Sequence, residues 1–209
     1  MFQGYTQGAI DFLWGLKLNN ERTWFQEHKQ EFIDLVDRPT RELAAQLLED
    51  MTEAFPKLGL ELKVSRIYRD ARRLFGRGPY KDHLWFSLRK PGEQDGHIPC
   101  FWFEIAPDHY GYGMGCWEML PATMAKLRAR IDRDPRPVEK LARAVARRGE
   151  FHLEGQEYKR PKGDPGPLLY PWYNRKGLGF TCERNCEGVF FTPELAGQVL
   201  EGWKSLVPQ

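Results

Sequence analysis

The sequence predicts a single α+β domain in which a mainly antiparallel sheet is flanked by N-terminal, central and C-terminal helices. Apolar residues recur at helical spacing before residue 56 and again at 121–148 and 193–206. Between residues 60 and 117 they alternate with polar residues, which is typical of strands. This order of helices first, then a meander of strands, then mixed elements favours the α+β class. The 209 residues, 41% hydrophobic and 13% aromatic, suffice for one well-packed domain over 1–209.

The first third of the chain is predicted to be helical. A short apolar stretch at 10–18 ends at Asn19 and Asn20, and either asparagine is expected to cap the next helix by accepting a backbone N–H. Pro39 is expected to end that helix or to open the following one at its first position. The apolar stripe at 43–55 then predicts a second long helix.

Four strands are predicted in the middle of the chain, at 60–68, 84–89, 98–106 and 109–117. Each is a short apolar or alternating run bounded by turn residues.

Three glycines stand at alternate positions of the last of these strands, Gly111, Gly113 and Gly115. Alternate residues share a face, so this strand is expected to have one bare side. Such a face admits a ring, another backbone or a ligand. The sequence leaves both the packing and the ligand interpretation open, and it favours packing.

The rest of the chain mixes helices and strands. The predicted helices within 121–148 carry nine Lys and Arg against three Asp and Glu, and a solvated basic face is the plainer interpretation. Strands are predicted at 151–160 and 177–183, separated by a Pro-rich loop at 161–171. An apolar stripe at 193–206 predicts a closing helix.

Composition narrows the function classes. No stretch reaches the roughly 18 apolar residues of a membrane-spanning helix, and the start of the chain lacks a signal-peptide pattern, so we expect a cytoplasmic protein with no membrane partner. Four scattered cysteines are expected to be reduced, and no His or Cys spacing predicts a metal or a cofactor. The glycine and serine motifs of nucleotide-binding proteins and hydrolases are absent, so no enzyme class is predicted.

The most informative feature is the segment 66–81, which holds six basic residues and one acid. The whole protein is nearly neutral, with 31 Lys and Arg against 29 Asp and Glu. Positive charge gathered in this way usually has an anionic partner, either in the protein or outside it.

Arg66 is the first of these bases. If 60–68 is one strand, Arg66 shares the core face with Leu62 and Val64, and a buried arginine needs a carboxylate or a bound anion. Glu104 is expected to face inward from the third strand. The sequence therefore predicts either an Arg66–Glu104 pair or a polar pocket lined by both residues.

Arginine outnumbers lysine five to one in the segment, which favours bidentate binding of phosphate or carboxylate. Gly76, Gly78 and Pro79 predict a tight turn, after which Tyr80 and Lys81 are placed to reach the same ligand. Asp70 is expected to orient one of the arginines. The alternative is a surface loop whose bases pair with the acidic region 21–53.

The chain resembles a known family. The matching residues are Phe2-Gln-Gly4, Phe12-Leu13, Asn19-Asn20-Glu-Arg-Thr-Trp24-Phe25, Arg66, Arg69-Asp70, Arg72, Pro79-Tyr80-Lys81 and Arg160-Pro-Lys-Gly163. They resemble a family of uncharacterised, mainly bacterial proteins, the domain of unknown function twenty-four sixty-one, over nearly the whole chain. The sequence departs from that pattern at Arg73, where Phe is usual, and at Arg77, where Lys is usual. The resemblance implies one fold unit and a common site, but no reaction. The site residues that it implies are Asn20, Trp24, Arg66, Arg69, Asp70, Arg72, Tyr80 and Lys81.

Three functional hypotheses follow. In the first, the protein binds a small anionic ligand: Arg66, Arg69 and Lys81 hold the anion, Tyr80 and Asn20 donate hydrogen bonds to it, and Trp24 walls the pocket. In the second, the 66–81 segment and the basic helices at 121–148 form one stripe that binds nucleic acid. In the third, the arginines are structural and bind no ligand. The first hypothesis is favoured.

Overall fold

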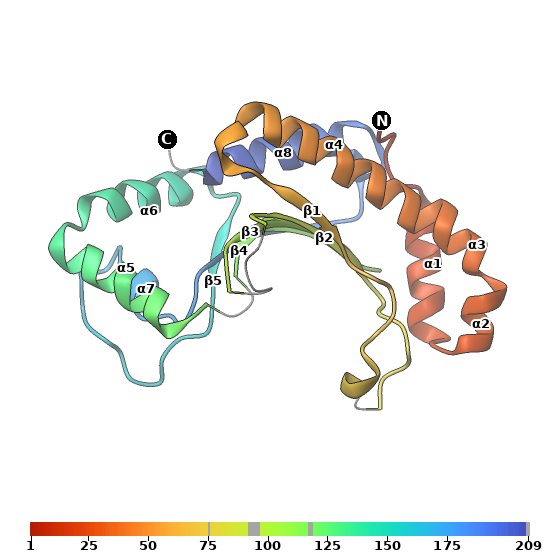
Figure 1. The fold of residues 1–209 in the computed structure, drawn as a ribbon, viewed down its shortest axis with the longest axis horizontal. Coiled ribbons are helices and arrows are strands. Elements are labelled where there is room, and N and C mark those ends of the chain that lie inside the picture. The colour runs from red at the N-terminus through yellow and green to blue at the C-terminus, as the bar shows by residue number, and fades with distance from the viewer. Residues whose placement is uncertain (75, 92–96, 117–118, 208–209) are drawn as a thin grey trace.

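A computed structural model describes residues 1–74, 76–91, 97–116 and 119–207, and it confirms the predicted class, a single α+β domain. Its strands form one antiparallel sheet in the order β1-β2-β3-β4-β6-β5 (Figure 1). Their bounds are β1 Glu61–Val64, β2 Leu84–Arg89, β3 Cys100–Ile105, β4 His109–Gly115, β5 His152–Glu154 and β6 Gly179–Asn185.

The helices gather at the two ends of the chain and between β4 and β6. They are α1 Gln7–Leu18, α2 Arg22–Glu27, α3 Lys29–Glu31, α4 Arg38–Ala54, α5 Pro121–Arg133, α6 Arg136–Arg148, α7 Tyr170–Tyr173 and α8 Glu194–Leu206. Short 3₁₀ turns cover Pro56–Leu58, Ala71–Arg73 and Gly188–Phe191, and a π-helical turn covers Phe32–Asp37. No helix among the described residues is long and apolar enough to cross a membrane.

Pro39 is the second residue of α4, close to the position that the sequence predicted for it. The π-helical turn Phe32–Asp37 directly precedes α4, so the chain remains helical up to the proline. Helical dihedrals therefore run up to Pro39 without a break, and the wider π-helical turn lies just before the position where a proline would remove an α-helical hydrogen bond.

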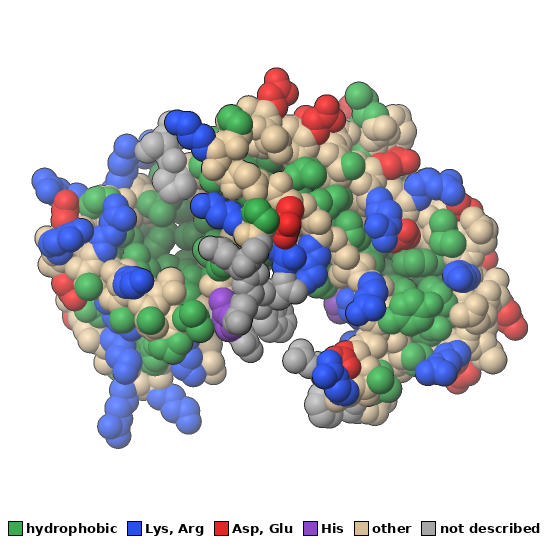
Figure 2. All heavy atoms as spheres, viewed as in Figure 1, with side chains coloured by type: hydrophobic (Ala, Val, Ile, Leu, Met, Phe, Trp, Pro, Cys, Tyr) green, Lys and Arg blue, Asp and Glu red, His purple; other side chains and the backbone are tan. Residues whose placement is uncertain are grey.

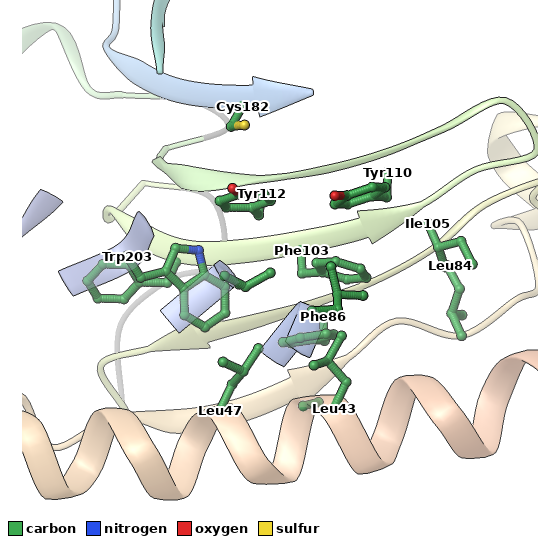
Figure 3. Packing of buried hydrophobic residues seen from close by; sticks show 14 of the residues in the cluster. Leu43, Leu47, Leu84, Phe86, Phe103, Ile105, Tyr110, Tyr112, Cys182 and Trp203 are labelled. Atoms are coloured by element: carbon green, nitrogen blue, oxygen red, sulfur yellow. The ribbon is translucent and has the colours of Figure 1, made fainter. Parts of the chain in front are cut away.

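One face of the sheet packs on α4 and α8 (Figure 1). Leu43 and Leu47 of α4 point toward Phe86 and Phe103, and Trp203 of α8 lies against the same face (Figure 3). All five side chains are fully buried. The alternation that predicted the strands therefore has its physical cause here, because every second side chain enters this apolar layer.

The opposite face carries Trp85, Ser87, Trp102 and Glu104, as the strand register requires. Figure 1 shows α4 and α8 above the sheet, whereas residues 66–74 and 76–80 at one end and α5 and α7 at the other lie below it. The molecule thus has the outline of an arch, with this second face of the sheet as its underside.

Gly111, Gly113 and Gly115 share that second face, as predicted, because they pair with Glu104, Trp102 and Cys100. A Cβ on Gly113 would lie 1.9 Å from the carbonyl oxygen of Phe180, and one on Gly111 would lie 3.3 Å from the ring of Trp102. The glycines therefore admit a neighbouring backbone and a ring, which favours the packing interpretation.

The predicted strand at 60–68 was too long, and the predicted position of Arg66 was wrong. β1 ends at Val64, Ser65 and Ile67 are buried, and Arg66 is exposed. The reason is a change of phase at Ser65, whose backbone N–H donates to the carbonyl of Trp85 and whose hydroxyl accepts from the N–H of Trp85. Past this residue the chain leaves the sheet and turns Arg66 outward.

Other predicted boundaries also moved. The strand expected at 151–160 is only His152–Glu154, and the strand expected at 177–183 is Gly179–Asn185. β4 ends at Gly115, and the predicted end of that strand at Trp117 lies outside the described residues.

Candidate functional site

The basic segment 66–81 folds back on itself as a two-stranded arm. Arg69 donates its backbone N–H to the carbonyl of Pro79 over 2.8 Å, and Lys81 donates to Ile67 over 2.7 Å. Tyr68 and Tyr80 pair between these bonds. The predicted turn is present: Gly76 has a φ of 78°, a left-handed conformation that glycine adopts without strain. We call residues 66–81 the basic arm.

Asn20 fastens the basic arm to the N-terminal helices. Its side-chain amide donates to the carbonyl of Tyr80 and accepts from the N–H of Tyr80, both over 3.0 Å. The residue before α2 is Glu21, so the expectation that Asn19 or Asn20 caps this helix was wrong. Close approach also explains Gly78, since a Cβ there would lie 2.2 Å from the Asn20 side-chain oxygen. Asn20 therefore has a positioning role.

Arg69 and Tyr80 are held by partners of their own. The Arg69 Nε donates to the carbonyl of Tyr80 over 2.7 Å, and one Nη lies 3.2 Å from a carboxylate oxygen of Asp82. The Tyr80 ring is fully buried and stacks on Phe25 at 4.1 Å between ring centres. Both residues stabilise the arm, and Arg69 keeps only part of its guanidinium for a ligand.

Asp70 binds Arg72, which agrees with the predicted role of Asp70 in orienting an arginine. The carboxylate accepts from the backbone N–H of Arg72 over 3.0 Å and from its guanidinium over 2.8 and 3.1 Å. The Arg72 side chain is 89% exposed, so this pair lies in solvent near the tip of the arm.

Trp24 lies apart from the basic arm's charges. Its ring stacks on His28 at 4.1 Å and contacts Phe12, and a Cβ on Gly15 would meet the ring at 2.9 Å. The structure therefore places Trp24 between α1 and α2, where it packs the N-terminal helices together.

A pocket of about 310 Å³ lies between α2 and the basic arm. It is lined by Arg22, Gln26, Tyr68, Arg69, Ala71, Leu74, Pro79 and Tyr80. Burial raises the pKa of the Tyr80 hydroxyl, as does Tyr68, while Arg22 and a contact with Gln26 act in the opposite direction. We call this cavity the arm pocket.

Arg22 and Gln26 were missed from the sequence, although they stand one helical turn apart on α2. Residues at i and i+4 share one helix face, which is a usable signal. This spacing indicates a pocket only once α2 is known to lie beside the basic arm.

Lys81 points to another part of the site, beside Arg66 and Glu104. Its ammonium donates to the backbone carbonyl of Arg66 over 2.5 Å and lies 5.7 Å from the ring centre of Trp85. Burial lowers the pKa of Lys81, the positive charges of Arg69 and Arg66 lower it further, and Glu104 raises it. Cations are thus crowded around Lys81 (Figure 2 shows the Lys and Arg side chains on and beside the arm).

The alternative in which Arg66 pairs with Glu104 is not what the structure contains. No ion pair joins them among the described residues, because Arg66 has turned outward. Glu104 instead lies 3.9 Å from the Nε2 of His83, whose Nδ1 lies 3.2 Å from Asp82. His83 was missed because a single histidine with no spaced partner carries little signal in a sequence.

The bases of the arm pair locally. In the described part of the chain, the ion pairs of Arg69 and Arg72 go to Asp82 and Asp70. The acidic region 21–53 contains its own pairs, Asp34–Arg38 and Asp37–Arg41. The predicted alternative, in which the arm's charges are balanced by the acidic helices, is therefore not how these two arginines are held.

Comparison with known proteins places the whole fold in one family. The sequence model described as "Conserved hypothetical protein (DUF2461)" matches residues 8–209. No curated protein matches the chain. The match includes all of α1 except Gln7, the other helices, the sheet and the arm pocket, so the site belongs to the same unit as the fold.

Proposed function

Because the chain belongs to the DUF2461 family, whose description as a conserved hypothetical protein states no reaction, we propose its function from the site: it binds a small anionic ligand in the arm pocket. The ligand carries a phosphate or a carboxylate group. The arm pocket is formed where α2 meets the basic arm, at the end of the molecule opposite α5–α7 (Figure 1).

The observation that carries this proposal is that two arginines, Arg22 and Arg69, both line the arm pocket. Arg69 is partly neutralised by Asp82, but Arg22 has no ion-pair partner among the residues that the structure describes. Two guanidinium groups around a cavity match the oxygens of phosphate or carboxylate better than ammonium groups do.

The remaining pocket groups fit an anion as well. The hydroxyls of Tyr68 and Tyr80 and the amide of Gln26 supply hydrogen-bond donors, and the 310 Å³ volume suits a small metabolite. Arg66 and Lys81 add positive potential near Arg69: burial lowers the pKa of Lys81, and the positive charges of Arg69 and Arg66 lower it further. Asn20 acts indirectly, because it holds the backbone of Tyr80.

The cytoplasm is the compartment that we propose for this activity. Cys100, Cys116, Cys182 and Cys186 are all free, and free thiols suit a reducing compartment.

The test is thermal stabilisation by phosphate, sulfate and a panel of carboxylate metabolites. At a ligand concentration of about 100 times Kd, binding adds about 2.7 kcal/mol, which raises the Tm of a chain this size by roughly 5–10 °C. We expect Arg22→Gln to abolish the rise while leaving the Tm without ligand unchanged within about 1 °C, because Arg22 is exposed and has no ion pair with any described residue.

The matched control is Arg130→Gln, which removes an exposed arginine from α5. It is expected to keep the full response to the anion. The proposal fails if no compound in the panel raises the Tm saturably, or if Arg22→Gln responds like the control. Arg69→Ala is a poorer test, since that change also breaks the arm.

A further inference from the structure

The region 121–176, which contains α5, α6, β5 and α7, carries most of the protein's uncompensated positive charge. We call it the basic lobe. It holds 14 Lys and Arg against seven Asp and Glu, an excess of seven positive charges. The whole chain has a net charge of only +2, so the rest of the molecule has an excess of five acids. The charge of the protein is therefore divided between two regions.

Every acid of the basic lobe already has a partner in the lobe or beside it. The partnerships are Asp132 with the Tyr173 hydroxyl, Asp134 with Arg136, Glu139 with Arg143, Glu150 with the Tyr112 hydroxyl, Glu154 with His152, Glu157 with Arg175, and Asp164 with the N–H of Gly166. Seven carboxylates against 14 Lys and Arg leave at least seven of these cations without a carboxylate of the lobe to balance them.

Ten basic side chains of the basic lobe are exposed and have no ion pair in the described part of the chain. They are Lys126, Arg130, Arg133, Lys140, Arg147, Arg148, Lys159, Arg160, Lys162 and Lys176. The positive charge of the lobe is therefore not explained by salt bridges within the lobe. Exposed cations without partners are the electrostatic footprint of a polyanion site.

The exposed cations stand in rows. Lys126, Arg130 and Arg133 repeat at intervals of four and three residues, so they share one face of α5. Lys140 and Arg147 are two turns apart on α6. The buried residues of the same helices, Met124 and Ile131 in α5, mark the opposite face. Figure 2 shows Lys and Arg side chains projecting around this end of the molecule.

We propose that the basic lobe binds the sugar–phosphate backbone of a single-stranded nucleic acid. The cations spread over two helices and the 159–160 loop, which suits a flexible strand that follows the lobe. Tyr170 is 39% exposed in the same region and offers a ring on which a base stacks. The lobe and the basic arm lie at opposite ends of the molecule (Figure 1), so they do not form the single stripe considered from the sequence.

The experiment measures binding of a fluorescent, mixed-sequence single-stranded oligonucleotide to the full chain across salt concentrations. With three or more phosphate contacts, the affinity is expected to fall roughly 20-fold between 50 and 200 mM salt. The variant Lys140→Gln, Arg147→Gln, Arg148→Gln is expected to weaken binding at least about tenfold at 50 mM salt and to flatten the salt slope by about two. All three positions are exposed, so the fold is retained; an unchanged Tm checks this.

The matched control removes the same charge elsewhere: Lys17→Gln, Lys29→Gln, Lys57→Gln, all exposed and outside the basic lobe. This control is expected to bind within about twofold of wild type. An equal loss in both triple variants, or no binding at 50 mM salt, overturns the proposal.

Three further binding measurements distinguish the class of partner. Tighter binding of duplex DNA, of inorganic polyphosphate or of phosphatidylserine vesicles than of the single strand overturns the assignment to single-stranded nucleic acid. Arg22→Gln is expected to leave oligonucleotide binding unchanged. Failure of this proposal is thereby distinguished from failure of the arm pocket, whose probe is a small anion.

Discussion

Asn20 and Arg69 both bond the backbone of Tyr80, from positions far apart in the chain. Their side chains have hydrogen-bonding groups that could bind a ligand. These groups instead hydrogen-bond backbone atoms of Tyr80, which lies outside the sheet. A buried backbone N–H or C=O must find a partner, and in the basic arm it finds one in side chains. At the residue scale, the strongest sequence signature is therefore largely structural, and it positions the wall of the arm pocket.

Replacing Asn20 tests this positioning role. Asn20→Ala leaves the Tyr80 N–H without its partner, and we expect the free energy of unfolding to fall by about 2 kcal/mol. The measurement is urea denaturation. Asn19→Ala is the matched control, because Asn19 bonds the Gly15 carbonyl at an exposed site and its loss is expected to cost under about 1 kcal/mol. Equal losses in the two variants would contradict the role given to Asn20.

Asp82 predicts a pH dependence. Burial opposes its ionisation, but a backbone N–H, His83 and Arg69 together lower its pKa below the ordinary value. A carboxyl group with a lower pKa in the folded state contributes stability that is complete above its unfolded pKa and is lost as pH falls through the folded pKa.

We therefore expect Asp82→Asn to cost about 2 kcal/mol at pH 7, and the difference from wild type to shrink from about pH 4 downward. Denaturation at a series of pH values measures this. Asp11→Asn, an exposed change on α1, serves as the comparison. A deficit for Asp82→Asn that persists unchanged at pH 2 would be incompatible with an ionised Asp82 as its source.

At the element scale, β4 and β6 approach closely because β4 presents glycine to its neighbour. Gly113→Ala places a methyl group against the Phe180 carbonyl, and backbone cannot move aside as a flexible side chain does. We expect a loss of about 2–4 kcal/mol. Gly197→Ala, in an open part of α8, is expected to gain up to about 1 kcal/mol. Thermal denaturation of both variants measures these changes. A Gly113→Ala variant as stable as wild type would contradict the prediction, because it would show that the two strands move apart easily.

The sequence predicted those elements whose signal is local. The stripe at 43–55 and the alternation of Leu62 and Val64 identified α4 and β1, since both patterns record burial against a neighbouring layer. It failed at Ser65, where a hydrogen bond to Trp85 in another strand shifts the phase. The same limit applies to the site: Arg69 and Tyr80 belong to a local signature, but Arg22, Gln26 and His83 join it only through the packing of distant segments.

At the scale of the whole molecule, two separate positive regions stand at opposite ends of an arch (Figure 1). The basic arm pairs two of its six bases, Arg69 and Arg72, with Asp82 and Asp70, and together with α2 it lines a small pocket. The basic lobe leaves its excess in solvent, and its cations are spread over helices. The two regions therefore suit anions of different size, which is why one probe is a metabolite and the other a polymer.

The division of charge between the basic lobe and the rest of the chain also makes the electrostatic potential over the surface uneven. The lobe has an excess of seven positive charges and the rest of the chain an excess of five acids, so the net charge of +2 understates the field near the lobe. At roughly 0.15 M ionic strength, screening over about 8 Å confines that field to the neighbourhood of the lobe. In dilute salt, a cation-exchange matrix is therefore expected to retain this nearly neutral protein through the lobe.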